Sequence, residues 1–164
     1  MSMNEERLIQ RDRMRFTKNT LSSSLALLAI LFNVLYFVSI YKSDVGSYYY
    51  NILMGASVLY NLLFMLVVFL SSEGVKGYKL SFAFVLLVVG ALQILRIFIL
   101  PARAHAAVVT ISKQKTIVMQ TAQFVRVVIY LSASAACCFV AGAVGIRKSR
   151  ALAAHMATLE QKAA

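Results

Sequence analysis

The side chains that most often perform catalysis are scattered along this sequence. All of the acids lie outside its long apolar stretches, and the last stretch separates His105 from His155. Cys137 and Cys138 are adjacent, and neighbouring side chains on a helix diverge, so the two thiols do not face one another. No Ser-His-carboxylate grouping, paired metal ligands or glycine-rich phosphate loop is found. We therefore predict no enzymatic activity, no metal site and no cofactor. The acids are Glu5, Glu6, Asp12, Asp44, Glu73 and Glu160.

One polar residue occupies the middle of each long apolar stretch. At ~1.5 Å per helical residue, the four lie about 14 to 20 Å from the same side of the expected bundle. A lone amide in lipid is costly, so these groups should turn inward and form hydrogen bonds between helices. They are either a polar clasp that fixes the helix register or part of a substrate or ion path. We favour the clasp, because the layer holds no carboxylate, lysine or histidine. The four residues are Asn33, Asn61, Gln93 and Ser134.

Three arginines lie near the opposite edge of the apolar stretches. Arg96 is the one formal charge inside a stretch, four residues before its end, while Arg103 and Arg126 flank the longest connection. We expect Arg96 to extend along its helix to the outer interface. The alternative is that the three form a basic ring that contacts an anionic headgroup or solute.

The last apolar stretch has a nearly continuous surface of small residues. They recur at four-residue spacing in two adjacent rows, which allows helix backbones to approach closely. This helix should lie between others, either within the chain or from a second chain. The packing candidates are Ala133, Ser134, Cys137, Cys138, Ala141, Gly142 and Gly145.

The elements that hold these residues are four apolar stretches, each of 20 or more residues. Each is long enough, as a helix, to cross a hydrocarbon core of ~30 Å. A hydrophobic content of 60%, a mean hydropathy of +0.76 and only 14% charged residues exceed what a soluble domain of this size can bury. We predict an all-α integral membrane protein, a single domain over residues 1–164. Its spans are predicted at about 21–41, 48–70, 80–100 and 127–146.

Short connections make the first three spans antiparallel neighbours. Pro101, which cannot donate a backbone hydrogen bond, should end the third span. Residues 101–126 have helical composition without glycine, and we expect an outer helical segment. It either continues the fourth span outward or lies along the membrane surface.

The distribution of cations predicts the orientation. Eleven of the 17 Lys and Arg residues lie in the tails at 1–20 and 147–164 or in the connection between the second and third spans. Short basic segments resist translocation, so both termini should be cytoplasmic. We expect the cell membrane as the location and anionic lipids as partners at the cytoplasmic face. These roles explain the net charge of +11 without nucleic acid.

Two functions remain at this point. The preferred one is a non-catalytic structural or accessory subunit of a membrane complex or homo-oligomer, in which other membrane chains or further copies are partners. The alternative is a small oligomeric transporter or channel that uses the midplane amides and the outer arginines. Four short helices enclose little volume, so transport would require self-association.

Overall fold

The computed structural model describes residues 18–41, 51–99, 101–106, 108–111, 114–117 and 119–163. Four long helices dominate it, as predicted: α2 (Thr20–Tyr41), α4 (Asn51–Lys76), α5 (Leu80–Ile99) and α7 (Thr121–Ala163). Each contains a segment long and apolar enough to cross a membrane. The second helix continues to Lys76, six residues beyond its predicted end. Ser71 and Ser72, which we expected in a loop, are therefore buried within α4.

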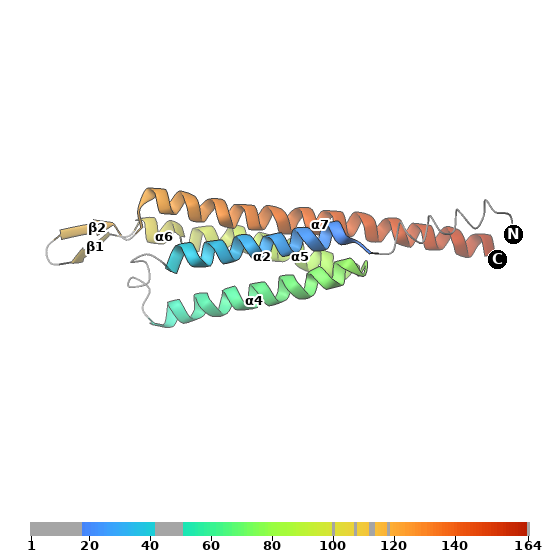
Figure 1. Ribbon diagram of the computed structural model, residues 1–164, viewed down its shortest axis with the longest axis horizontal. Coiled ribbons are helices and arrows are strands. Elements are labelled where there is room, and N and C mark those ends of the chain that lie inside the picture. Colours follow the sequence, from blue (N-terminus) through green and yellow to red (C-terminus); the bar gives the residue numbers. More distant parts are fainter. Residues whose placement is uncertain are drawn as a thin grey trace.

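The four long helices form a ring in which each packs against two neighbours (Figure 1). The helix α7 packs against α2 and α5, and α4 contacts the same two helices from the other side. Consecutive helices run in opposite directions, so the bundle is antiparallel. We call its two ends the turn end, where α4 connects to α5, and the hairpin end, which lies opposite.

Local interactions fix the helix ends at the turn end. Asn19 caps α2, because its side-chain oxygen accepts a hydrogen bond from the Ser22 amide at 3.4 Å. After α4, Tyr78 adopts a φ of 58°, and the Lys79 amide donates to the Gly74 carbonyl at 3.1 Å. The Ser149 hydroxyl donates to the Tyr78 carbonyl at 3.0 Å, which ties α7 to this turn.

The fourth long helix extends well past the bundle at the turn end (Figure 1). It contains 43 residues, about 64 Å at the usual helical rise, or roughly twice the thickness of a hydrocarbon core. The predicted basic tail at 147–164 is thus a continuation of α7 up to Ala163.

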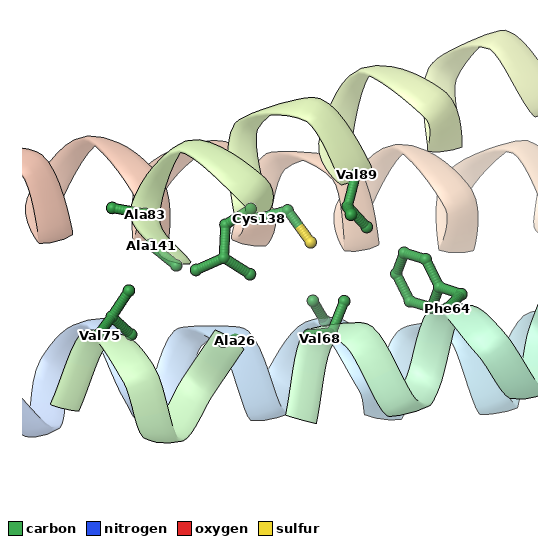
Figure 2. Close-up of a cluster of buried hydrophobic side chains, with 10 residues drawn as sticks. Ala26, Phe64, Val68, Val75, Ala83, Val89, Cys138 and Ala141 are labelled. Carbon is green, nitrogen blue, oxygen red and sulfur yellow. The ribbon is translucent and has the colours of Figure 1, made fainter. Parts of the chain in front are cut away.

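An apolar core fills the part of the bundle nearer the turn end. Figure 2 shows side chains from all four long helices that point toward one another there. Small residues from α2 and α7 face larger ones from α4 and α5, so the helices pack closely. The buried members are Ala26, Ala29, Phe64, Val68, Val75, Ala83, Leu86, Val89, Cys138 and Ala141.

The prediction of a helical segment over 101–126 is wrong for its central part. A short helix, α6 (Pro101–Ala106), is followed by the antiparallel strands β1 (Val108–Ile111) and β2 (Gln114–Ile117). In the register of this hairpin Val108 pairs with Ile117, and Ile111 pairs with Gln114. Strands of Val, Ile and Thr suit a hairpin, because β-branched side chains favour extended backbone.

The helix α6 extends the bundle at the hairpin end. Proline fits the first position of a helix, where its missing N–H is not needed, so Pro101 begins α6 directly after α5. A second apolar cluster forms here, with Ala104 of α6 packed among residues of α2 and α7. Its buried members are Tyr36, Ile40, Ala104, Met119, Val127 and Leu131.

Large apolar side chains cover the outside of the bundle. On α4 the side chains of Leu59, Leu62 and Leu66 are more than half exposed, and Val88 and Phe98 are equally exposed on α5. Such a surface is stable in lipid and unfavourable in water. Together with the four long apolar helices, it makes this chain a multi-pass membrane protein.

Candidate functional site

Arg96 is buried deep inside the bundle. It lies 16 residues after the start of α5, or about 24 Å from the turn end at the usual helical rise. Only 4% of the residue is exposed. We had expected this side chain to extend to the outer interface, and the structure places it in the interior instead. The reason is α6, which lengthens the bundle beyond the predicted end of the third span.

Oxygen atoms from two neighbouring helices surround the Arg96 guanidinium. Its Nη1 donates to Asn61 Oδ1 at 2.9 Å and to Asn33 Oδ1 at 3.5 Å, while Nη2 donates to Ser57 Oγ at 3.5 Å. Asn61 is itself oriented, because its Nδ2 donates to the Ser57 carbonyl at 2.9 Å. These contacts join α5 to α2 and α4 and offset part of the cost of a charge in the membrane interior.

Two aromatic rings flank the same guanidinium. The Cζ atom of Arg96 lies 4.4 Å from the ring centroid of Tyr36 and 4.6 Å from that of Tyr60. At these distances the electron-rich ring faces attract the cation. Tyr36 comes from α2 and Tyr60 from α4, so the arginine is held between the two helices.

Gln93 connects three helices one turn away from Arg96. Its Nε2 donates to Asn33 Oδ1 at 3.0 Å and to Ser134 Oγ at 3.3 Å. Ser134 in turn donates to the Ala29 carbonyl at 2.9 Å. The Asn33 oxygen thus accepts from both Gln93 and Arg96. The four residues named from the sequence as a polar layer therefore lie in one interior network with Arg96.

Asn33 Nδ2 and Gln93 Oε1, both on fully buried residues, make no hydrogen bond with any residue that the structure describes. A buried polar group without a partner is costly, and such atoms are commonly satisfied by ordered water or a ligand.

Apolar side chains lie on both sides of the network along the bundle axis. Toward the turn end, Phe64, Val68 and Leu86 belong to the first apolar cluster. Toward the hairpin end, Val127 and Leu131 belong to the second. The apolar layer on the turn side includes all four long helices, whereas the buried members on the hairpin side come mainly from α2, α6 and α7.

A cavity of about 240 Å³ opens beside Arg96, between α4 and α5. Its lining surface is almost entirely apolar, although Ser57, Tyr60 and Arg96 are among the residues that form it. Its rim reaches the lipid-facing surface, because Leu92, Leu95 and Ile99 are 44%, 54% and 51% exposed. The lining residues are Ala56, Ser57, Tyr60, Leu92, Leu95, Arg96 and Ile99.

The other two arginines named from the sequence lie elsewhere. Arg103 is exposed on α6 and Arg126 is exposed on the first part of α7, whereas Arg96 faces the interior. Arg96 is thus buried and the other two arginines are exposed, while their shared contact with an anionic headgroup or solute stays a prediction.

The small residues of α7 pack mainly against helices of the same chain. A Cβ added at Gly142 would lie 2.9 Å from the Ala83 carbonyl oxygen of α5, and one at Gly145 would lie 3.0 Å from the Ala83 Cβ. The Cys138 Cβ approaches Gly90 in the same way, at 3.2 Å from the position of an added Cβ. Ser134, Cys138, Ala141, Gly142 and Gly145 are buried, while Ala133 and Cys137 are half-buried.

A second polar cluster lies at the turn end. The hydroxyls of Ser23 and Ser72 are 2.8 Å apart, and the Ser72 hydroxyl also lies 3.3 Å from the Ser23 carbonyl oxygen. Ser22 donates to the Ala141 carbonyl, which links α2 to α7. Within the described ranges, no group of three or more His, Cys, Asp and Glu residues could hold a metal ion.

Comparison with known proteins adds no further assignment. No protein-family model matches this sequence, and neither the curated proteins nor the solved structures contain a significant match.

Sequence reasoning did not find the aromatic and hydroxyl partners of Arg96. A spacing signal was present, since Gln93 and Arg96 are three residues apart and Ser57 and Asn61 are four apart, which places each pair on one helix face. Tyr36 likewise lies three residues after Asn33. Polar and aromatic residues at these spacings inside apolar helices indicate a shared interior site.

Proposed function

We propose that this chain is a non-catalytic subunit of a membrane complex or a homo-oligomer in the cell membrane, with both termini in the cytoplasm. The principal support is the closed interior of the bundle. The packed cluster around Phe64, Val68 and Leu86 lies between the polar network and the turn end. A conducting path would need polar groups or water along this stretch. A bundle fixed by interior contacts instead suits a scaffold for other membrane chains.

The charge distribution supports the proposed orientation. Lys76 and Lys79 flank the turn between α4 and α5, and Arg147, Lys148 and Arg150 lie on α7 as it leaves the bundle at the same end. Cations on cytoplasmic segments favour this orientation and attract anionic lipids.

Purification of the tagged full-length chain in a mild detergent tests the subunit proposal. Mass measurement by native mass spectrometry should find either a stoichiometric membrane partner or a defined oligomer of this chain. Recovery of an isolated monomer that moves a solute across reconstituted vesicles would refute the proposal and favour the transporter.

Alanine variants at Asn33, Asn61 and Gln93 separate the two functions further. If the polar network is a clasp, these variants lower the yield of the assembly and leave vesicle flux at the background level. Intact assembly with altered flux contradicts the clasp. Leu62→Ala is the matched control, because Leu62 is 56% exposed on α4 and faces lipid.

Cysteine labelling tests the orientation. Thr158→Cys places a thiol on the exposed end of α7, and Thr110→Cys places one in the hairpin. An impermeant maleimide added to intact cells should label the hairpin variant and spare the α7 variant. The reverse pattern contradicts cytoplasmic termini, and the unmodified chain gives the background from Cys137 and Cys138.

A further inference from the structure

We propose that the cavity between α4 and α5 binds a long-chain carboxylate, an amphiphile of the fatty-acid type, that enters sideways from the lipid. The carboxylate would bind Arg96, and the hydrocarbon chain would leave through the apolar rim. This site is independent of the subunit role, so either proposal can fail while the other stands.

The route of entry follows from where the apolar residues lie. Along the bundle axis, packed clusters lie on both sides of the network. Laterally, the exposed side chains of Leu92, Leu95 and Ile99 form the rim of the cavity on the lipid-facing surface. A ligand dissolved in the bilayer therefore meets the opening directly.

Arg96 supplies the recognition of the head group. A guanidinium presents its N–H groups in a planar fork that matches the two oxygens of a carboxylate. Asn61 Oδ1 accepts from the guanidinium at 2.9 Å, whereas Ser57 Oγ, on a residue that also lines the cavity, is 3.5 Å away. Such a long hydrogen bond is weak, so an anionic oxygen can replace it with a gain in strength.

The size of the cavity and its depth determine which anion fits. The volume of about 240 Å³ lies below the ~300–1,000 Å³ of ordinary ligand pockets, so it accommodates a small head group and the first part of a chain. Arg96 is only 4% exposed. Desolvation of a head group bound there favours one negative charge over two, which favours a carboxylate over a phosphate monoester.

The test uses the full-length protein in nanodiscs of zwitterionic phospholipid and a photoreactive fatty acid with a diazirine on its chain. Light should crosslink the probe to α4 and α5, and peptide mass spectrometry locates the site. Unlabelled palmitate should compete, whereas palmityl alcohol, which has no charge, and acetate, which has no chain, should not.

Two variants test the two parts of the proposed site, which are the charge of Arg96 and the open volume of the cavity. Arg96→Gln removes the charge and should weaken binding roughly 10- to 100-fold, because charge-assisted hydrogen bonds are lost. Ala56→Phe leaves Arg96 in place but fills the cavity, and it should abolish crosslinking. Ala91→Phe is the control, since Ala91 is exposed on α5 and does not line the cavity.

Several results overturn the proposal. Equal competition by the alcohol shows that the charge is not recognised, and equal competition by acetate assigns the site to a soluble anion. Stronger competition by a lipid phosphate monoester replaces the carboxylate with a phosphate ligand. Wild-type crosslinking in a folded Ala56→Phe variant excludes the cavity, even if Arg96→Gln fails to fold.

Discussion

The two halves of the bundle use polar residues in different ways. Toward the turn end, the short hydroxyls of Ser22, Ser23 and Ser72 pair with each other or with backbone carbonyls. Toward the hairpin end, the long side chains of Asn61 and Arg96 meet in the interior, and a cavity of about 240 Å³ lies beside them.

This difference distinguishes polar residues that stabilise close helix packing, in the turn half, from polar residues that lie beside room for a ligand, in the hairpin half. A serine hydroxyl adds little bulk, so helices with serine, alanine and glycine approach closely and leave no room for a ligand. Arginine and amide side chains bring a charge and its hydrogen-bond partners into the interior, and a cavity lies between α4 and α5 at the level of Ser57 and Arg96. We therefore expect the turn half to tolerate loss of hydrogen bonds but not added volume, and the hairpin half to show the opposite.

The largest effect should come from added volume in the closely packed half. The added Cβ of Gly142→Leu would lie 2.9 Å from a backbone oxygen of α5, and backbone cannot move aside cheaply. We expect a loss of about 3 kcal/mol or more in the free energy of unfolding, measured by denaturant titration in detergent.

Gly55→Leu is the matched control for that variant, because a Cβ at Gly55 meets nothing within 4 Å. It should be neutral or slightly stabilising. Similar losses for both glycine variants would contradict the close packing of α7 against α5.

How far the sequence predicts this molecule depends on the part considered. Long apolar runs have one favourable fold in lipid, so the four helices could be predicted from composition and length alone. The strands β1 and β2 could not, because residues 108–117 contain neither glycine nor proline to mark a turn. The Val, Ile and Thr residues of this segment favour extended backbone, but they do not by themselves mark where a hairpin reverses.

The position of Arg96 was mispredicted for a related reason. Pro101 indicates the end of a helix, but it also suits the start of a new one, and only tertiary packing decides between the two. The contact of Ala104 with Tyr36 and Val127 places α6 inside the bundle. A charge assigned to the membrane edge is therefore buried inside the bundle, where only 4% of the residue is exposed.

The second prediction concerns Asn61, the closest acceptor of Arg96. Asn61→Ala removes the 2.9 Å hydrogen bond to the guanidinium, and a charged donor in the interior makes such a loss expensive. We expect a decrease of about 2 kcal/mol in the same unfolding measurement. Leu62→Ala on the adjacent, lipid-facing position should change it by less than about 0.5 kcal/mol. Equal effects would show that Arg96 does not depend on this contact.

Gln93 should matter less, because its partners Asn33 and Ser134 are neutral. Gln93→Leu keeps most of the volume and removes the hydrogen bonds to Asn33 and Ser134. Hydrogen bonds between membrane helices contribute about 0.6 kcal/mol on average, so a loss of about 1 kcal/mol is expected. A stabilised Gln93→Leu would mean that the unpartnered Gln93 Oε1 costs more than the two hydrogen bonds supply.

The smallest effect is expected at the serine pair of the turn half. Ser72→Ala removes the contact with Ser23 but fits the same close helix approach, so the loss should be only about 0.6 kcal/mol. The exposed Ser81→Ala on α5 is the control and should not change the free energy of unfolding.

Ser72 lies eleven residues after Asn61 on α4, about 16 Å along the helix, so the two halves should respond independently. Unfolding energies of the double variant Asn61→Ala/Ser72→Ala should then equal the sum of the single changes within about 0.5 kcal/mol. A larger departure would show that the apolar core between the halves transmits strain, and that the bundle behaves as one unit rather than two.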